Sequence, residues 1–135
     1  MPLMLWGPKY SVNIREIDWQ HQQLFGMLND LYDAMQAGTG RAVIADVLEK
    51  LLNYTQYHFT SEESLLREHG YADQASHRAE HVALTGRTQE LRRRFEAGEL
   101  GVAAETLHFL ADWLRSHIVG SDMKYVAFLN ARGVV

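Results

Sequence analysis

The chain has 135 residues, of which 47% are hydrophobic and 22% charged, a composition that indicates one globular domain with a substantial core and excludes a disordered chain. Its net charge of −4 gives no electrostatic reason to expect nucleic acid or an anionic membrane as a partner. The absence of cysteine excludes disulfides, thiolate metal sites and cysteine nucleophiles. No apolar run has the length of a signal peptide or a membrane span, so we expect a cytoplasmic protein without stable membrane association.

Proline and glycine divide the chain into an arm and four helices. Pro2 and Pro8 are the only prolines, so the chain beyond them is free to be helical. Residues 1–17 are predicted to form an arm whose apolar residues pack along the helices. Glycines then separate the predicted helices, which lie at about 18–37, 42–69, 74–95 and 103–119 and are followed by a short helical extension at about 121–131.

Within these segments, apolar residues recur at helical spacing, as at Leu24, Leu28 and Leu31. Gly70 is the predicted C-terminal cap of the second helix. Because the connections are short, neighbouring helices must run antiparallel. We therefore predict an all-α, up-down-up-down four-helix bundle that forms a single domain over residues 1–135, with an N-terminal arm and a short C-terminal helical extension.

Two pairs of metal-binding side chains are spaced by one helical turn. His58 and Glu62 lie four residues apart in the second predicted helix, and His77 and His81 lie four apart in the third. Residues at this spacing differ in direction by only ~40°, so each pair shares one helix face. One such pair alone is more often a solvated or ion-paired face than a metal site.

Two further histidines extend this pattern to the other helices. His21 lies one turn before Leu24, on the buried side of the first predicted helix, and His117 follows Trp113 by one turn on the fourth. A single core histidine is more often a hydrogen-bonded structural residue than a ligand. However, imidazoles and carboxylates on the inner faces of four consecutive helices would each need a buried partner, so the whole set favours a metal site.

The spacing alone leaves the direction of Asp122 open. Asp122 lies five residues after His117, which would turn it ~140° away on an unbroken α-helix. Gly120 permits a wider turn or a break that would redirect the carboxylate. Two other histidines are predicted to lie outside the site, because His69 is at a helix end and His108 is on the face opposite His117.

The predicted ligand types restrict the metal. Histidine and carboxylate without thiolate suit iron, manganese, zinc or copper. Seven ligands exceed the needs of one tetrahedral zinc, whereas two ions bridged by Glu62 and Asp122 would use them all. A zincin would need Glu directly after the first His, where Gln22 and Arg78 stand. A ferritin-like site needs two Glu-x-x-His motifs, but the chain has one, at 105–108, and a haem bundle would need only one or two ligands.

The chain resembles the hemerythrin family, in its single-domain bacterial form. The resemblance covers nearly the whole chain and rests on residues 17–25 around His21 and on three further motifs, which are His58-Phe59-x-x-Glu62-Glu63, His77-x-x-x-His81 and His117-Ile118-x-x-x-Asp122. It implies a non-haem di-iron centre inside a four-helix bundle, with Asp122 among the ligands.

The resemblance also implies how the ligands divide between two iron ions. Three histidines would hold one iron and two would hold the other, and both carboxylates would bridge the irons together with an oxo or hydroxo group. The iron with fewer protein ligands would keep a position open for O₂. The three histidines on one iron would be His77, His81 and His117, and the two on the other would be His21 and His58. The bridging carboxylates would be Glu62 and Asp122. Separately from the resemblance, the candidates for an apolar lining are Leu24, Phe25, Trp113, Leu114 and Ile118, which fit a role as ordinary core residues at least as well.

The function implied by the resemblance is reversible O₂ binding for storage, delivery or scavenging, by a monomer that is not an enzyme. An O₂-consuming enzyme would be a natural recipient. Two alternatives stay open: a di-iron redox enzyme (peroxidase, ferroxidase or nitric-oxide processing) and an O₂ or redox sensor. The inner faces offer no obvious proton donor for turnover. The chain ends at Val135 without an output module, so a sensor would need a separate partner.

Overall fold

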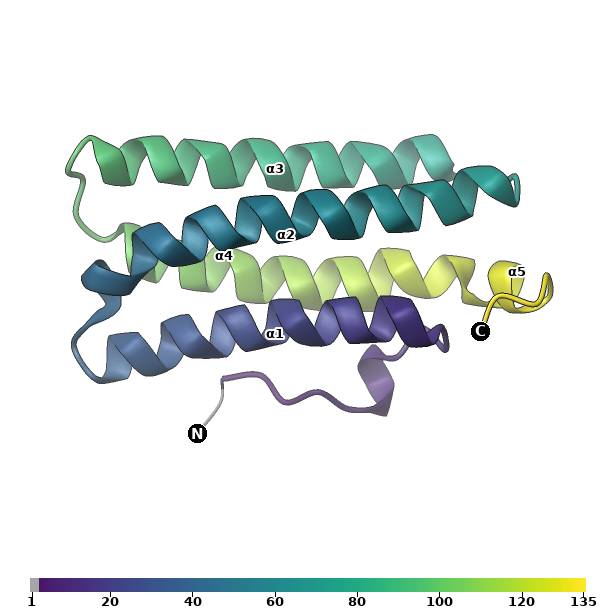
Figure 1. Cartoon of the computed structure of the whole chain (residues 1–135), viewed down its shortest axis with the longest axis horizontal. Coiled ribbons are helices and arrows are strands. Elements are labelled where there is room, and N and C mark those ends of the chain that lie inside the picture. The colour runs from purple at the N-terminus through teal and green to yellow at the C-terminus, as the bar shows by residue number, and fades with distance from the viewer. Residues whose placement is uncertain (1–2) are drawn as a thin grey trace.

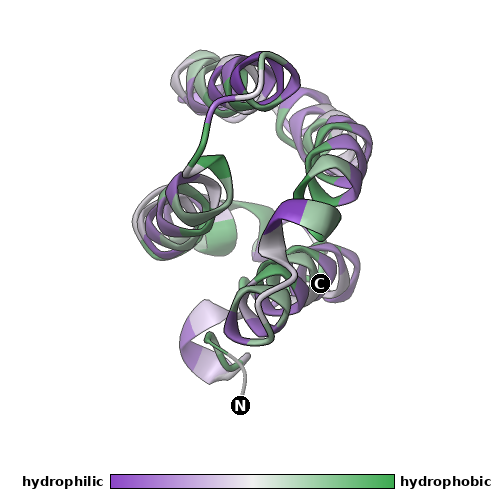
Figure 2. Ribbon diagram, turned by 90° about the vertical axis from the view of Figure 1, so that its left-hand side faces the viewer, coloured by the Kyte–Doolittle hydropathy of each residue, from purple (hydrophilic) through white to green (hydrophobic). Residues whose placement is uncertain are grey.

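The computed structural model describes residues 3–135, and the first two residues of the predicted arm lie outside this range. Four long helices lie along the long axis of the molecule (Figure 1), and they are α1 (Arg15–Gln36), α2 (Gly40–Glu68), α3 (Gln74–Glu96) and α4 (Val102–Ser116). Helices α1 and α3 each pack against both α2 and α4, and Figure 2 shows the four end-on around a common interior. This arrangement confirms the predicted all-α four-helix bundle.

The end of α4 departs from α-helical geometry. A π-helical segment, η2 (His117–Ser121), follows α4 directly, and a 3₁₀-helix, η3 (Asp122–Tyr125), leads into the short α5 (Val126–Asn130). The backbone N–H of Asp122 donates to the carbonyl of His117, which closes the five-residue step of a π-helix. The fourth helix was predicted to end at about residue 119, which lies within this π-helical segment. A π-helical turn is one residue wider than an α-helical turn.

The arm lies along α1 and is fixed to it by polar and aromatic contacts. The backbone N–H of Met4 donates to Oδ1 of Asn29 (3.0 Å), and Nδ2 of Asn29 donates to the carbonyl of Met4 (2.9 Å). The ring of Tyr10 packs edge-on against Phe25, with their centroids 4.8 Å apart. These contacts hold the arm against α1, and Met4 and Tyr10 are buried there.

Two clusters of buried apolar residues lie on either side of the histidines along the chain. On α1, Ile17 belongs to the smaller cluster and Leu24 to the larger one, and His21 lies between them. On α2, Leu51 belongs to the larger cluster and Leu66 to the smaller. The polar side chains therefore occupy one layer of the bundle, enclosed by apolar packing along the helix axes.

The turn after α2 directs α3 back along the bundle. Gly70 has a φ of 70°, the left-handed conformation that glycine adopts without a Cβ clash. The backbone N–H of Tyr71 then donates to the carbonyl of Leu66 (2.9 Å). This tight reversal places the start of α3 beside the end of α2. Within residues 3–135, no helix is both long and apolar enough to cross a bilayer.

Replacing Leu48 with alanine tests the packing of the larger cluster. Leu48 is fully buried on α2, so Leu48→Ala should lower the free energy of unfolding by about 2–5 kcal/mol through lost burial and the cavity it leaves. Leu100→Ala is the matched control, because Leu100 is 79% exposed, and should change stability by less than about 0.5 kcal/mol. Urea unfolding measures both, and equal effects would contradict the assigned core.

Candidate metal centre

The seven polar side chains predicted from the sequence meet in one buried layer of the bundle. Each is 4% exposed or less. They come from α1, α2, α3 and the segment directly after α4, so the site exists only when the whole bundle has formed. His21 comes from α1, His58 and Glu62 from α2, His77 and His81 from α3, and His117 and Asp122 from the π-helical segment after α4 and the residue that follows it.

The π-helical turn directs Asp122 into the site. Its Oδ1 lies 2.9 Å from Nε2 of His117 and 2.9 Å from Nε2 of His77. On an unbroken α-helix the five-residue step would aim the carboxylate ~140° away from His117. The extra residue in the turn brings Asp122 back to the same face, in keeping with the frequent occurrence of π-helical turns at functional sites.

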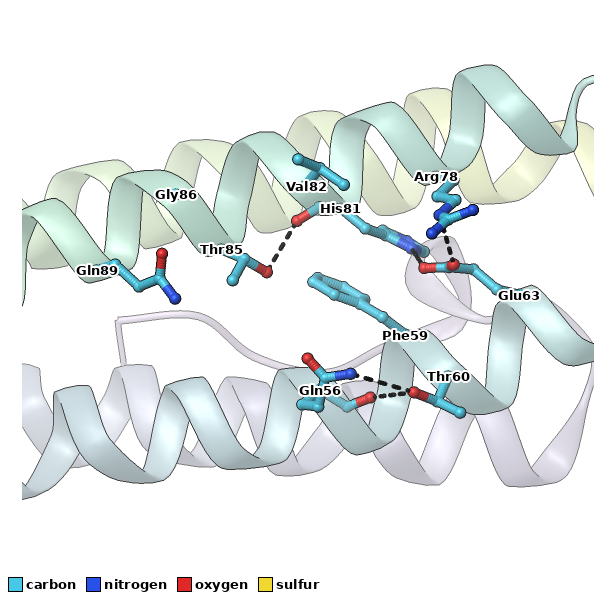
Figure 3. Close-up of a pocket in the computed structure, with 10 residues that line it drawn as sticks. All are labelled: Gln56, Phe59, Thr60, Glu63, Arg78, His81, Val82, Thr85, Gly86 and Gln89. Carbon is cyan, nitrogen blue, oxygen red and sulfur yellow. Dashed lines mark hydrogen bonds and ion pairs between the residues drawn. The ribbon is translucent and has the colours of Figure 1, made fainter.

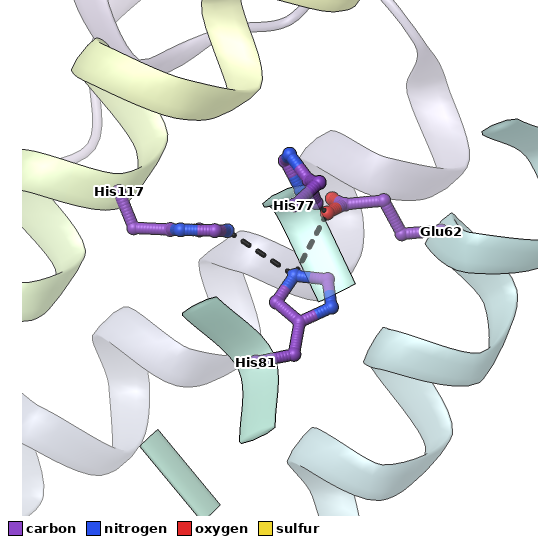
Figure 4. Close-up of side chains that lie close together, drawn as sticks. All are labelled: Glu62, His77, His81 and His117. Carbon is purple, nitrogen blue, oxygen red and sulfur yellow. Dashed lines mark hydrogen bonds and ion pairs between the residues drawn. The ribbon is translucent and has the colours of Figure 1, made fainter. Parts of the chain in front are cut away.

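Three histidines gather on one side of the layer. Nε2 of His81 faces Nε2 of His117 at 3.2 Å. Oε1 of Glu62 lies 3.1 Å from Nε2 of His81 and also contacts Nε2 of His77. Figure 4 shows these four side chains converging from α2, α3 and the end of α4. Together they can offer four ligand atoms to one cation.

Two histidines gather on the other side. Nε2 of His21 faces Nε2 of His58 at 3.1 Å. Oε2 of Glu62 lies 3.6 Å from Nε2 of His58, and Oδ2 of Asp122 lies 3.1 Å from Nε2 of His21. Each carboxylate therefore turns one oxygen toward the three-histidine group and the other toward the two-histidine group. This is the arrangement that two bridged metal ions require.

The close contacts fit metal ligation better than direct hydrogen bonding. Ligand atoms ~2.1 Å from one ion and at right angles to each other lie ~3 Å apart, as these atoms do. Both oxygens of Asp122 are buried, and within residues 3–135 neither accepts a hydrogen bond of acceptable geometry, although three imidazole nitrogens lie close by. These oxygen and nitrogen atoms are therefore close enough together to share a bound cation.

Residues behind two of the histidines fix their tautomers. Nδ1 of His58 donates to Oε1 of Gln20 (2.5 Å), and Nδ1 of His81 donates to Oε2 of Glu63 (2.9 Å). A proton on Nδ1 leaves the Nε2 lone pair free to face a metal ion. The sequence-based prediction named neither as a site residue, although Gln20 lies within the motif at residues 17–25 and Glu63 ends the motif that begins at His58.

Tyr125 is another contact that the sequence-based prediction missed. It is fully buried, and its hydroxyl donates to Oε2 of Glu62 at 2.9 Å. Burial and the neighbouring Glu62 carboxylate raise the pKa of Tyr125 well above its usual range, so the phenol stays a donor. It orients Glu62 from the side of the smaller apolar cluster.

Electrostatic interactions set the protonation states of the side chains in this layer. Burial lowers the pKa of His58 to about 3, so its ring is neutral. Burial would raise the pKa of Asp122, but contacts with His117, His21 and His77 hold it well below its usual range. Burial would likewise lower the pKa of His77, but Asp122 and Glu62 raise it to about 10. A proton on His77 thus supplies positive charge where a metal cation would otherwise supply it.

Aromatic rings cover two of the histidines. Phe59, which the sequence-based prediction did not place here, stacks on His81 with centroids 3.8 Å apart and planes at 5°. Trp113 stacks on His117 at 4.3 Å and 13°. Trp113 packs against the larger cluster as a partly buried residue, and the other expected lining residues belong to that cluster, namely Leu24, Phe25, Leu114 and Ile118.

The fold and the site together define a helical-bundle protein whose buried histidines and carboxylates are arranged to hold two metal ions. Residues 12–129 match the model of the hemerythrin HHE cation binding domain. The chain belongs to the hemerythrin family, which confirms the resemblance found in the sequence.

Named relatives agree with this assignment. The chain is 39% identical to a bacteriohemerythrin of Methylococcus capsulatus over 132 residues, covering 97% of this chain and all of the relative. It is 32% identical to a hemerythrin-like protein of Naegleria gruberi, covering 92% of each chain. A wild-type hemerythrin crystal structure superposes with a TM-score of 0.84 at 40% identity, covering 94% of this chain and 98% of that one. The L114A mutant of hemerythrin gives 0.86 at 40% identity, covering 96% and 98%.

Replacing Tyr125 with phenylalanine tests its contact with Glu62. Tyr125→Phe leaves a buried carboxylate oxygen without its donor and should destabilise the metal-free protein by about 1–3 kcal/mol. Tyr57→Phe is the matched control, because Tyr57 is 49% exposed, and should stay within about 0.5 kcal/mol of wild type. Urea unfolding of metal-free protein gives both values. A Tyr125→Phe protein as stable as wild type would show that the hydroxyl does not support Glu62.

Proposed function

We propose that this protein binds O₂ reversibly at a non-haem di-iron centre and serves O₂ storage, delivery or scavenging, without catalytic turnover. One observation carries the proposal. Each of two buried carboxylates directs one oxygen to a group of three histidines and the other to a group of two. The groups therefore differ by one histidine, which leaves one metal ion with fewer protein ligands. Membership of the hemerythrin family supports iron as the metal and O₂ as the ligand.

The grouping of the side chains supports an assignment of residues to the two ions. His77, His81 and His117 would hold one iron, His21 and His58 would hold the other, and Glu62 and Asp122 would bridge them. A di-iron group held there would supply the redox chemistry for reversible O₂ binding. Imidazole and carboxylate donors suit a non-haem iron centre, whereas iron–sulfur clusters are held by cysteine thiolates.

The chain's own residues would keep this chemistry reversible. Leu24, Leu114 and Ile118 are completely buried, so they exclude water from the bundle interior beside the histidines. Exclusion of water strengthens electrostatic interactions and limits side reactions. Tyr125 and Gln20 hold Glu62 and His58 in fixed directions from behind. A site held by several rigid helices needs little rearrangement when a small ligand enters.

Iron content and optical spectra test the proposal directly. The purified protein, loaded anaerobically with ferrous iron, should hold two irons per chain. Addition of O₂ should produce an absorption change that reverses when O₂ is removed. A two-iron protein that shows no spectral change with O₂ would contradict O₂ binding. Continuous O₂ consumption with an added reductant would indicate an enzyme instead.

A pair of histidine variants tests the ligand assignment. His117→Ala removes a ligand of the three-histidine group, so iron content should fall below two per chain and the O₂-dependent spectrum should be lost. His108→Ala is the matched control, because His108 is exposed on α4 and lies outside the cluster, and it should retain two irons. Elemental analysis and circular dichroism give iron content and helicity. Full iron content in His117→Ala would refute the assignment.

A further inference from the structure

Glu63 connects the metal layer to the protein surface. Its Oε2 accepts the Nδ1 proton of His81 at 2.9 Å, and its Oε1 lies 3.6 Å from Nε of Arg78. Figure 3 shows the Glu63 carboxylate between the His81 ring and the Arg78 guanidinium, at one end of a groove between α2 and α3. The groove has a volume of about 350 Å³. Glu63 is 27% exposed, so it belongs to neither the interior nor the open surface.

The contact with His81 is the stronger of the two. The imidazole of His81 is buried, so its Nδ1–H needs an acceptor, and Glu63 provides one at hydrogen-bond distance. Arg78 is 74% exposed, and an ion pair of this kind with a solvated guanidinium contributes little. The position of the Glu63 carboxylate is therefore dictated mainly by the histidine.

The two histidine groups differ in the charge of the residues behind them. In the three-histidine group, Glu63 bonds His81, and Oε1 of Glu80 lies 3.5 Å from Nδ1 of His117. In the two-histidine group, the residue behind His58 is Gln20, a neutral amide. A carboxylate that accepts the distal proton of a ligating imidazole makes that imidazole more basic, whereas an amide does so less. The three-histidine group is thus the more electron-donating of the two.

We propose that Glu63 is a positioning residue that holds His81 in its Nδ1–H tautomer and, through it, lowers the reduction potential of the iron in the three-histidine group. This inference rests on the proposed di-iron function. A more basic imidazole stabilises the ferric ion over the ferrous ion. Glu63 therefore favours transfer of an electron from this iron, while Gln20 leaves the other group without that bias.

Charge-swapped variants test the effect on the potential. Glu63→Gln keeps an acceptor for His81 but removes the charge, and should shift the equilibrium toward the ferrous form by about tenfold, or about 59 mV for a one-electron step. Gln20→Glu places a carboxylate behind His58 and should shift it the opposite way. Glu49→Gln, at an exposed position ~21 Å along the same helix, changes net charge equally and should leave the potential unchanged. Redox titration followed optically measures all four proteins.

A measurement without iron separates this inference from the proposed function. Imidazole ¹H–¹⁵N spectra of the metal-free protein should show His81 protonated at Nδ1 in wild type and in Glu63→Gln, and not in Glu63→Ala. A wild-type His81 protonated only at Nε2 would overturn the positioning role. Equal potentials for wild type and Glu63→Gln would overturn the tuning role. Failure of the wild-type protein to bind iron or O₂, with the Nδ1–H signal present, would count against the di-iron function and leave the positioning of His81 supported.

Discussion

The burial of two carboxylates side by side is the constraint on which the rest of this structure depends. Glu62 and Asp122 are both fully buried and share His77 as a neighbour. Two negative charges that contact the same imidazole in a low-dielectric interior repel each other strongly, and each carboxylate also loses its hydration. Positive charge must therefore enter the same layer, as a protonated histidine or as metal cations. The imidazoles from α1, α2, α3 and the segment directly after α4 serve this need, so folding and assembly of the site are one event.

Apolar packing on both sides gives this polar layer its rigidity. The two hydrophobic clusters enclose the histidines along α1 and α2, and stacking of Phe59 and Trp113 restricts the rings from the flanks. Close packing of this kind resists compression and keeps side chains in single rotamers. Ligand atoms placed by helices within such packing can hold positions set to a fraction of an ångström, which reversible chemistry at a metal pair requires.

The sequence predicted much of the fold and most of the inward-facing polar residues. The prolines lie only in the arm and glycines separate the amphipathic segments, and this pattern was enough to predict four antiparallel helices. Helical spacing was enough to predict that His58 and Glu62 share one helix face. The direction of Asp122 could not follow from spacing, because the π-helical turn depends on tertiary packing. The contacts of Gln20 and Glu63 were equally hidden. Each is adjacent in sequence to a residue of the layer, so its side chain points ~100° away from that residue around the helix axis. What it contacts depends on how the packed helices are rotated relative to one another.

The asymmetry of the layer is the last element that function requires. Reversible uptake of O₂ by two metal ions needs one ion that leaves a position free and another that gives up an electron readily. The two-histidine group supplies fewer ligands and has a neutral residue, Gln20, behind it. The three-histidine group supplies one ligand more and has the carboxylate of Glu63 behind it. Ligand number and the charge behind the ligands thus favour the same division of roles. That agreement would not be expected if the polar residues outside the layer had been placed for solubility alone.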